Sequence, residues 1–438
     1  MNSGIDRNEV IEIRKIPRGW KMVKLHELGE KHDSVVAGPF GSNLKVSDYR
    51  DEGVPIIRLQ NIDRSRFLDK DIKYISEEKA KELQYHSFKA GDLLLAKLGD
   101  PIGKTCLAPQ NMRNGIVVSD VVRVRISSEK AITQFMEFVL NCDYCTKQLN
   151  KQTIGTTRPR VNLTGIRELM IALPPPAEQQ KITLILSKVD NLIQKTEEII
   201  EQSQRLKKGL MQELLIKGIG HNKFKKTIWG NIPDEWAVMK LADVCIERSG
   251  ILTGPFGSLL HQRDYRSEGI PIITVEHLKE NRISHQDVPH VSEEDYRRLA
   301  RYILMTGDIV FSRVGTVDRS ALVTDYENGW LFSGRCLRIR PNQAIMDAGY
   351  LSWFFSLQSF KNYIRRIAVG ATMPSLNTEL LRNVEIIVPS LSEQKKIGKA
   401  ISKVDAVEKI EIKMNETLYL FKKGLMQKLL TGKIRVKV

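Results

Sequence analysis

Residues 99–105 contain the residue types of a phosphate-binding loop. The run Gly99-Asp100-Pro101-Ile102-Gly103-Lys104-Thr105 combines two glycines with a lysine and a hydroxyl side chain. A nucleotide-hydrolysing loop has four residues between its glycines, and this run has only three. The corresponding run later in the chain, Gly315-Thr316-Val317-Asp318-Arg319-Ser320, lacks the second glycine and the lysine. We therefore predict no nucleotide hydrolysis at either loop.

The other candidates for chemistry are also incomplete. Cys142 and Cys145 have the spacing of half a zinc site or of a redox pair, but no second pair of ligands follows and the segment has a helical pattern. A DNA amino-methyltransferase needs a Pro-Pro-Tyr/Phe loop and a glycine-rich cofactor loop, and the run Pro-Pro-Pro-Ala at 174–177 supplies neither. The acidic pairs at 77–78 and 293–294 follow a serine at a predicted helix start, where capping explains them. The sequence thus predicts no catalytic residue and no metal site in this chain.

The charge of the chain points to an anionic partner. The sequence has 68 Lys and Arg against 52 Asp and Glu, a net charge of +16. Nucleic acid fits this excess best, because the basic residues are not gathered on one short amphipathic helix as a membrane-surface segment would require. No apolar run approaches the length of a membrane span or a signal-peptide core. The five cysteines are few and odd in number, so we expect a reducing, cytoplasmic location.

The elements that would position these residues occur twice in the chain, which makes an internal repeat the main feature of the sequence. In the first part of the repeat one constant offset relates the copies, with Trp20 matching Trp236, 38–42 matching 254–258, and 48–50 matching 264–266. A single-residue gap shifts the offset in the later part, where Gly155 matches Gly370, Pro159 matches Pro374, and 207–212 match 422–427. The repeat covers about 16–218 and 232–433.

Each copy begins with a segment of mixed secondary structure. Short runs rich in Ile, Leu and Val at 56–59, 93–95, 116–118 and 121–124 are typical of strands, and turn-forming residues bound them. Helical stretches at 131–150 and 346–366 intervene. We predict an α+β domain in each copy.

Each copy ends in a predicted long helix, from about 177 to 217 in the first copy and about 60 Å long. Prolines precede both helices, and Ser390 with Glu393 has the spacing of a capping box. Apolar residues follow the alternating three- and four-residue rhythm of a coiled-coil seam, and two such seams would pack on each other in antiparallel fashion. The predicted seam residues are Ile182, Ile185, Val189, Leu192, Ile199, Leu206, Leu210, Ile397, Val404, Val407, Met414, Leu418, Phe421 and Leu425.

Two kinds of residue interrupt this helical pattern. Thr196 and Glu411 occupy equivalent seam positions, where a solvated seam edge, register control and contact with a partner all remain open. Gly209 and Gly424 lie inside the helices at the same place in each copy, although glycine costs about 1 kcal/mol relative to alanine there. Their recurrence indicates close helix approach or partner docking; a tolerated defect is the alternative.

These motifs together resemble the DNA specificity subunit of type I restriction-modification systems, over the whole chain from about residue 16. The resemblance rests on the Gly-Pro-Phe-Gly-Ser loop, the Gly-Asp before a Leu/Val-rich strand, and the Gly-Thr-Thr-Arg-Pro or Gly-Ala-Thr-Met-Pro loop. It rests further on Leu-Pro-Pro-Pro-Ala-Glu-Gln-Gln-Lys-Ile at 173–182, on Val-Pro-Ser-Leu-Ser-Glu-Gln-Lys-Lys-Ile at 388–397, and on Lys-Lys-Gly-Leu-Met-Gln near each helix end.

The resemblance implies two target-recognition domains, joined by two long antiparallel coiled-coil helices in a pseudo-two-fold tandem repeat, each domain reading one half of a bipartite site in double-stranded DNA. The helices would act as a spacer whose length sets the unread gap, and would dock two methyltransferase subunits. Restriction subunits would complete the complex, and S-adenosylmethionine, ATP and Mg would be bound by partner subunits, with no cofactor in this chain. The implied boundaries are 1–15 for an N-terminal extension, 16–173 and 232–388 for the domains, 174–218 and 389–433 for the spacer helices, and 219–231 for a linker.

Loop residues that are hydrogen-bonding or cationic in both copies are the candidates for DNA contact. Those kept in type suit phosphates, and those that differ suit base reading, because two domains should read different half-sites. Arg158 and Arg160, for example, have the reach to bind guanine in bidentate fashion. The full candidate set is Ser42, Asn43, Arg58, Gln60, Asn61, Lys97, Lys104, Thr156, Thr157, Arg158, Arg160, Ser258, Thr274, Glu276, His277, Arg313, Arg319, Thr372 and Ser375.

Two other functions remain as alternatives. One is an enzyme that itself modifies DNA, against which the missing catalytic motifs argue. The other is a coiled-coil scaffold whose globular domains bind protein, against which the net charge of +16 argues.

Overall fold

The computed structural model describes residues 16–437, apart from 30–32, 156–158, 248 and 371. It divides into two compact units: unit 1 comprises Met1–Glu197 and Lys413–Val438, and unit 2 comprises Glu198–Ile412. Each unit therefore contains one globular domain together with part of each long helix. The predicted N-terminal extension, 1–15, lies outside the described residues.

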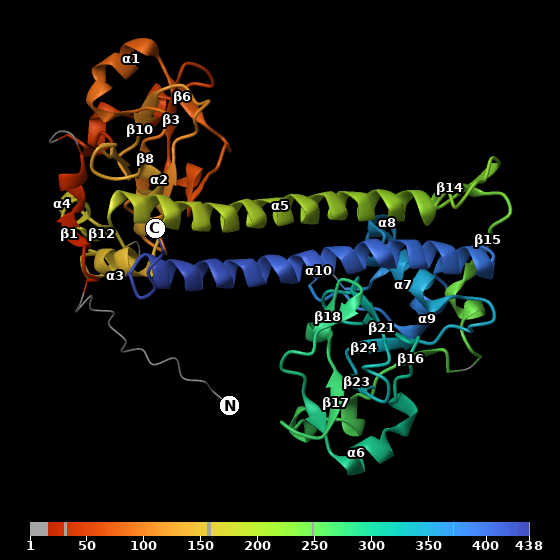
Figure 1. Cartoon of the computed structure of the whole chain (residues 1–438). Coiled ribbons are helices and arrows are strands. Elements are labelled where there is room, and N and C mark those ends of the chain that lie inside the picture. The colour runs from red at the N-terminus through yellow and green to blue at the C-terminus, as the bar shows by residue number, and fades with distance from the viewer. Residues whose placement is uncertain (1–15, 30–32, 156–158, 248, 371, 438) are drawn as a thin grey trace. The chain divides into compact units, whose positions relative to one another are not determined.

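The globular domain of unit 1 is built on two four-stranded sheets (Figure 1). The first is antiparallel with the order β2-β11-β8-β9, at Val35–Ala37, Val121–Val124, Leu93–Ala96 and Thr105–Leu107. The second has the order β6-β3-β10-β7, at Lys73–Ile75, Val54–Ile57, Gly115–Val117 and Ser87–Phe88, and its β3–β10 pair is parallel. Two small antiparallel pairs complete the strands: β1 (Lys21–Lys24) with β12 (Met170–Leu173), and β4 (Ile62–Asp63) with β5 (Arg66–Phe67). The helices are α1 (Glu77–Glu82), α2 (Thr133–Leu140), α3 (Asp143–Lys151) and α4 (Leu163–Arg167).

Unit 2 repeats this topology with one strand fewer in its second sheet. Its antiparallel sheet has the order β16-β24-β21-β22, at Ile251–Thr253, Cys336–Ile339, Ile309–Ser312 and Ser320–Leu322. Its second sheet has the order β20-β17-β23, at His290–Val291, Ile270–Ile273 and Leu331–Phe332, again with one parallel pair, β17–β23. The small pairs are β15 (Ala237–Lys240) with β25 (Glu385–Val388) and β18 (Leu278–Lys279) with β19 (Arg282–Ile283). The helices are α6 (Glu293–Arg298), α7 (Ala348–Ser356), α8 (Gln358–Ile367) and α9 (Thr378–Arg382). The α+β class and the tandem repeat are confirmed.

The continuous apolar runs in the sequence have a simple cause in the first sheet of each unit. Successive side chains of a strand point to opposite faces, and here both faces are covered. In β8, Leu93 and Leu95 pack in one core, whereas Leu94 and Ala96 pack in another. The same division occurs in β21, where Ile309 and Phe311 lie in one core and Val310 in the other. Such strands carry no polar alternation.

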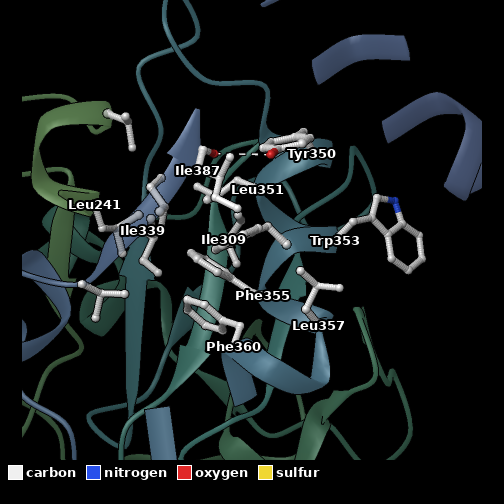
Figure 2. Close-up of a cluster of buried hydrophobic side chains, with 14 of the residues drawn as sticks. Leu241, Ile309, Ile339, Tyr350, Leu351, Trp353, Phe355, Leu357, Phe360 and Ile387 are labelled. Atoms are coloured by element: carbon white, nitrogen blue, oxygen red, sulfur yellow. Dashed lines mark hydrogen bonds between the residues drawn. The ribbon is translucent and has the colours of Figure 1, made fainter. Parts of the chain in front are cut away.

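The largest core of unit 2 lies between its antiparallel sheet and helices α7 and α8. In Figure 2, Ile309 and Ile339 of the strands and Leu351, Phe355 and Phe360 of the helices point toward one another. The buried Tyr350 hydroxyl donates to the Ile387 carbonyl at 3.3 Å, which satisfies its one polar atom. This core packs α7 and α8 against the antiparallel sheet. The strand ends from which the loops start are therefore part of a packed structure.

The two long helices, α5 (Pro176–Leu214) and α10 (Leu391–Leu429), have 39 residues each and contact each other within each unit. In unit 1, Asp190 pairs with Lys422 at 2.5 Å and Glu197 accepts from the Tyr419 hydroxyl at 2.7 Å. In unit 2, Gln204 donates to Glu408 at 3.2 Å, and Lys207 pairs with Asp405 at 3.0 Å. In both units, residues later in α5 contact residues earlier in α10, which confirms the antiparallel arrangement.

The structure corrects the predicted seam. The buried positions on α5 begin Ile182, Leu186, Val189, Ile193, and the pattern on α10 begins with Ile397 and Ile401. The first position of each seven-residue repeat, such as Ile182 or Val189, is therefore buried as predicted. The second packed position lies four residues after the first, at Leu186 or Ile193, and not three residues after it. The predicted residues Leu192, Ile199 and Leu206 are exposed by 52%, 41% and 54%, and Val407, Met414 and Phe421 by 47%, 51% and 55%. Apolar residues occur both three and four residues after the first position of a repeat, as Ile185 and Leu186 do after Ile182, so spacing alone could not identify the residue that packs.

The segment after each long helix closes its unit through a glutamate near the start of the other helix. In unit 1, Glu178 accepts from the Trp20 indole at 3.2 Å and from Arg435, which follows α10. In unit 2, Glu393 accepts from the Trp236 indole at 3.0 Å and from the Ile219 amide at 2.9 Å. These bonds explain why the glutamate of the Glu-Gln motif recurs.

The predicted linker, 219–231, is more ordered than its polar composition suggested. It contains β13 (Phe224–Thr227) and the first half of β14 (Gly230–Pro233), which form an antiparallel hairpin. No helix among the described residues is long and apolar enough to cross a membrane.

Candidate nucleic-acid interface

Three loops of unit 1 meet beside the end of β8. They are the Gly-Pro-Phe-Gly-Ser loop at 38–42, the β8–β9 connection at 97–104, and the loop at 154–160. Arg160 forms backbone bridges with both Leu98 and Ile154, and the Val161 amide donates to the Lys97 carbonyl at 3.0 Å. The Gly38 amide donates to the Val121 carbonyl at 3.0 Å, which fixes the first loop beside β11. The predicted candidates Asn43, Lys97 and Arg160 thus belong to one loop cluster.

Unit 2 builds the same loop cluster from equivalent residues. Ser375 forms backbone bridges with Val314 and Val369, and the Leu376 amide donates to the Arg313 carbonyl at 2.8 Å. The Gly254 amide donates to the Cys336 carbonyl at 3.1 Å. The candidates Ser258, Arg313, Thr372 and Ser375 lie on these loops, and all but Arg313 and Ser375 are largely exposed.

Close packing at one glycine of the Gly-Pro-Phe-Gly-Ser loop explains part of its recurrence. A Cβ on Gly38 would lie 2.2 Å from the Val117 carbonyl oxygen, and one on Gly254 would lie 2.1 Å from the Ser333 carbonyl oxygen. The second glycine turns the chain, because Gly41 and Gly257 have φ of 60° and 62°, which favour glycine. The loop is therefore held against the sheet at its start and turned sharply after the phenylalanine.

The phenylalanine of this loop covers a cation in each unit. The Lys97 ammonium lies 4.2 Å from the centroid of the Phe40 ring, and the Arg313 guanidinium carbon lies 5.5 Å from that of Phe256. Lys97 is only 3% exposed, and its burial lowers the pKa of the ammonium. A phosphate could reach this ammonium only beside the ring, so the direct phosphate contact predicted for Lys97 is restricted by Phe40.

The charged surroundings of the loop cluster differ between the units. In unit 1, Arg160 donates to Asp120 at 2.8 Å and is half exposed. The equivalent positions in unit 2 hold Ser375 and the exposed Arg335, whose carbonyl accepts from the Arg313 amide at 2.8 Å. The ion pair between Arg160 and Asp120 in unit 1 is thus replaced in unit 2 by a serine hydroxyl and an exposed arginine on the same backbone frame.

The structure corrects the base-reading role predicted for Asn61. Its side chain is buried, accepts from the Arg58 amide at 3.0 Å, and donates to the carbonyls of Leu68 and Lys70. Arg58 and Gln60 both donate to Asp71, at 2.9 Å and 3.1 Å, and hold the pKa of that carboxyl below its usual range. These residues close a turn and pair within it.

His277 in unit 2 is corrected in the same way. It is buried, and its Nδ1 accepts from the Thr274 amide at 3.1 Å, as Asn61 does from Arg58. The Thr274 hydroxyl donates to Glu276. The two copies have different side chains here, but Asn61 and His277 both accept a hydrogen bond from the backbone amide three residues earlier and so stabilise the same turn.

The β8–β9 connection is a hairpin in the structure, and a strand, not a helix, follows it. A phosphate loop needs a helix N-terminus at that place, so the predicted absence of a nucleotide site agrees with the local fold. Lys104 pairs with Asp63 at 3.0 Å; burial opposes the effect, but this contact holds the pKa of Asp63 below its usual range. Arg319 is exposed, and its backbone bonds to Ser312.

Some predicted residues lie outside what the structure describes. Thr156, Thr157 and Arg158 belong to the undescribed part of the third loop, and the side chain of Ser42 is likewise not described. Within the described ranges, no group of three or more His, Cys, Asp or Glu side chains could hold a metal ion. All five cysteines, including Cys142 and Cys145, are free and buried.

Comparison with known proteins gives a consistent result. The family model for the type I restriction modification DNA specificity domain matches residues 17–204 and again residues 233–419. The type I restriction enzyme MjaVIII specificity subunit of Methanocaldococcus jannaschii is 28% identical over 351 residues, covering 79% of this chain and 80% of that protein. The EcoKI specificity subunit of Escherichia coli K12 is 21% identical, covering 92% of this chain and 86% of its own.

Two solved structures share the fold. The S subunit of a type I restriction-modification system from M. genitalium aligns with a TM-score of 0.59 at 14% identity, over 95% of this chain and 97% of that chain. A chain from a structural study of type I complex assembly and conformational transition aligns with a TM-score of 0.52 at 17% identity, over 96% of this chain and 100% of that chain.

Proposed function

The chain belongs to the family of type I restriction-modification DNA specificity proteins, and from this premise we propose that each of its units reads one half of a bipartite DNA site. The chain is a non-catalytic specificity subunit that works with DNA and with the other subunits of its system. The observation that carries the proposal is the loop cluster built twice on one backbone frame, with Arg160 and Asp120 in unit 1 replaced by Ser375 and Arg335 in unit 2. Equal frames with unequal polar groups suit two readers of different sequence.

Within this proposal, polar groups of the loop cluster, and Asn43 directly after its first loop, read bases or hold phosphates. Asn43 and Arg160 serve unit 1, with Thr156, Thr157 and Arg158 on the same loop. Ser258, Arg313, Thr372 and Ser375 serve unit 2. A bidentate arginine contact to guanine contributes about 1–3 kcal/mol of discrimination. Arg160 would exchange its pairing with Asp120 for such a contact.

We further propose that two methyltransferase subunits dock on the long helices, one per copy of the repeat. The exposed apolar positions support this number: Leu192, Ile199 and Leu206 on α5 recur at the matching positions of α10 as Val407, Met414 and Phe421. These six side chains do not belong to the packed cores of either unit. Two equivalent sets of apolar side chains suit two identical partners.

The helical glycines support the same docking role. A Cβ on Gly209 or on Gly424 would meet no atom within 4 Å, so neither glycine is needed for a close approach inside its unit. Each lies three residues after an exposed apolar residue, Leu206 or Phe421, and hence on the same helix face. A glycine there leaves room for the backbone of a partner.

Each unit also has a cavity beside its Lys-Lys-Gly-Leu-Met-Gln motif. In unit 1 the cavity measures about 640 Å³ and is lined by Lys422, Lys423 and Met426 of α10. In unit 2 the equivalent residues Lys207, Lys208 and Met211 of α5 line a cavity of about 460 Å³. Recurrence of a cavity at the same motif supports a second point of contact for the same kind of partner.

We propose, as the family resemblance implies, that partner subunits of the full complex bind S-adenosylmethionine, ATP and Mg, and that this chain carries no cofactor. We place the complex in the cytoplasm, where its DNA is available and its five free thiols stay reduced.

Exchange of one domain tests the two-reader proposal. Residues 20–172 are replaced by the first domain of another specificity subunit, and methylated sites are sequenced in DNA modified by the assembled complex. We expect one half-site to change and the other half-site and the gap to stay the same. A change in both half-sites would contradict separate reading by the two units.

A further inference from the structure

Phe40 and Phe256 are exposed aromatic side chains at equivalent positions of the repeat. They are 59% and 60% exposed, although phenylalanine is a residue that folding normally buries. One such residue on a surface needs no explanation. The same exposure at matching positions of the two copies, in loop clusters where Arg160 and Asp120 are replaced by Ser375 and Arg335, indicates that the exposed ring is kept for contact with a partner.

Each ring is held firmly on its loop. Gly38 and Gly254 press the start of the loop against backbone carbonyls, and the turn follows directly at Gly41 and Gly257. The inner side of each ring is occupied by a cation, Lys97 in unit 1 and Arg313 in unit 2. One face of the ring is therefore fixed from within, and exposed ring surface remains for a partner at little further cost in side-chain entropy.

The surroundings of the rings are both cationic and apolar. Arg160 in unit 1 and Arg335 in unit 2 bring positive charge to the same loop cluster, and Ile154, Val369 and Met373 add exposed apolar side chains. A surface that combines cations with flat apolar faces matches a partner with an anionic backbone and flat apolar faces, which is the chemistry of nucleic acid. A purely apolar protein partner would offer no anion to Arg160, which is paired with Asp120, or to the exposed Arg335.

We infer that Phe40 and Phe256 each press the ring against a base of duplex DNA, as an apolar wedge in one half-site. This inference rests on the proposed function, in which each unit reads one half-site, and it adds one contact residue per unit. The wedge contacts whichever base step the neighbouring polar groups bring beneath it. It therefore contributes affinity and bends or unstacks the step, while the polar groups select the sequence.

The test uses the full chain assembled with its methyltransferase subunits, without S-adenosylmethionine. The probe is a duplex that carries the bipartite site read from methylated DNA. Phe40→Ala and Phe256→Ala should each raise the Kd roughly tenfold, because a base–aromatic contact is lost. Phe40→Trp should retain the affinity. The matched controls are Tyr85→Ala in unit 1 and Tyr326→Ala in unit 2, whose rings are 59% and 67% exposed but lie outside the loop cluster.

A second measurement separates a base contact from a change in loop structure. 2-Aminopurine, whose fluorescence rises when it is unstacked, is placed at successive positions of each half-site. Binding of the wild-type complex should raise the fluorescence at one base step in each half-site, in addition to any base that the methyltransferase extrudes. Phe40→Ala should abolish that signal in one half-site only, and Phe256→Ala in the other only. The slope of log Kd against log salt should not fall in either variant, because no cation is removed.

The outcomes separate this inference from the function beneath it. If the wild-type complex prefers no DNA sequence, the proposed function fails. If the wild type is selective but Phe40→Ala and Phe256→Ala behave like the tyrosine controls, the wedge is wrong and the two-reader proposal stands. If the variants weaken assembly with the methyltransferase in the absence of DNA, the rings contact protein and the inference is overturned.

Discussion

Glu137 is a buried carboxyl in the core of unit 1, where it accepts from the Leu107 amide at 3.1 Å. Burial raises its pKa from the ordinary 4.5 to about 7; the nearby Asp190 raises it further, and Lys422 opposes the shift. Between about pH 4.5 and pH 7 the folded protein keeps a proton that the unfolded chain has released. The free energy of unfolding therefore falls as the pH rises through this window.

Glu137→Gln should remove this loss of stability. The amide still accepts from Leu107 but cannot ionise, so the variant should match the wild type near pH 4.5 and exceed it at pH 7.5, by up to about 3 kcal/mol. Thermal unfolding of both proteins across that pH range measures the difference, with Glu129→Gln as the exposed control. An equal gap at all pH values would mean that Glu137 does not titrate as its burial requires.

At the residue scale, the sequence predicted the secondary structure around the loops better than it predicted the contacts of each side chain in them. Lys97 and Arg313 were identified by charge, and both lie in the loop clusters. Asn61 and His277 were misread because a hydrogen-bonding side chain that differs between copies can serve a turn as well as a base. The exposure of Phe40 and Phe256 was not predicted, although the repeated glycines around them indicated a tightly turned loop.

At the element scale, the exposed face of each long helix gives a testable consequence. Gly209→Ala and Gly424→Ala favour the helix by about 1 kcal/mol each in the free chain. If the glycines leave room for a partner, the added methyl groups should weaken methyltransferase binding by about 1–3 kcal/mol. Calorimetric titration of the partner measures this, with Glu201→Ala as the control, because Glu201 is exposed on α5 but lies two residues from Ile199 and so on another face. Unchanged binding together with higher stability would identify the glycines as tolerated defects.

The helices themselves were predicted closely, from about 177 to 217 against Pro176–Leu214 in the structure, because proline, capping and periodicity all act locally. The face of each helix that packs against its neighbours was not predicted correctly. Choosing between Ile185 and Leu186, or between Leu192 and Ile193, requires the partner helix and the neighbouring domain, which periodicity does not contain. The capping box was half right: Ser390 accepts from the Glu393 amide at 3.3 Å, but the Glu393 carboxylate binds Trp236 and Ile219.

At the scale of the whole molecule, each unit contains parts from both copies of the repeat. The globular domain and first part of α5 in unit 1 are completed by the last part of α10, and the reverse holds in unit 2. The repeat predicted this pairing, because equivalent helices have equivalent apolar faces. The order of the strands was beyond the sequence, since short buried runs carry no record of their neighbours.

A half-length chain should therefore complete itself with a second copy. Residues 1–221 contain the equivalent of every segment in unit 1, since the end of α5 matches the end of α10. We expect this fragment to fold only as a homodimer, with a Tm that rises with protein concentration. Analytical ultracentrifugation and thermal unfolding measure this. A stable folded monomer would show that the long helices need no partner from the other copy.

The closing contacts at Glu178 and Glu393 carry one more consequence. Glu393 receives the segment that follows α5, and Glu178 receives the segment that follows α10. Both contacts bind a tryptophan from a domain start in the same way. Each glutamate thus joins the start of one domain to the segment after the long helix of the other copy, so each unit is closed by a contact between the two copies of the repeat.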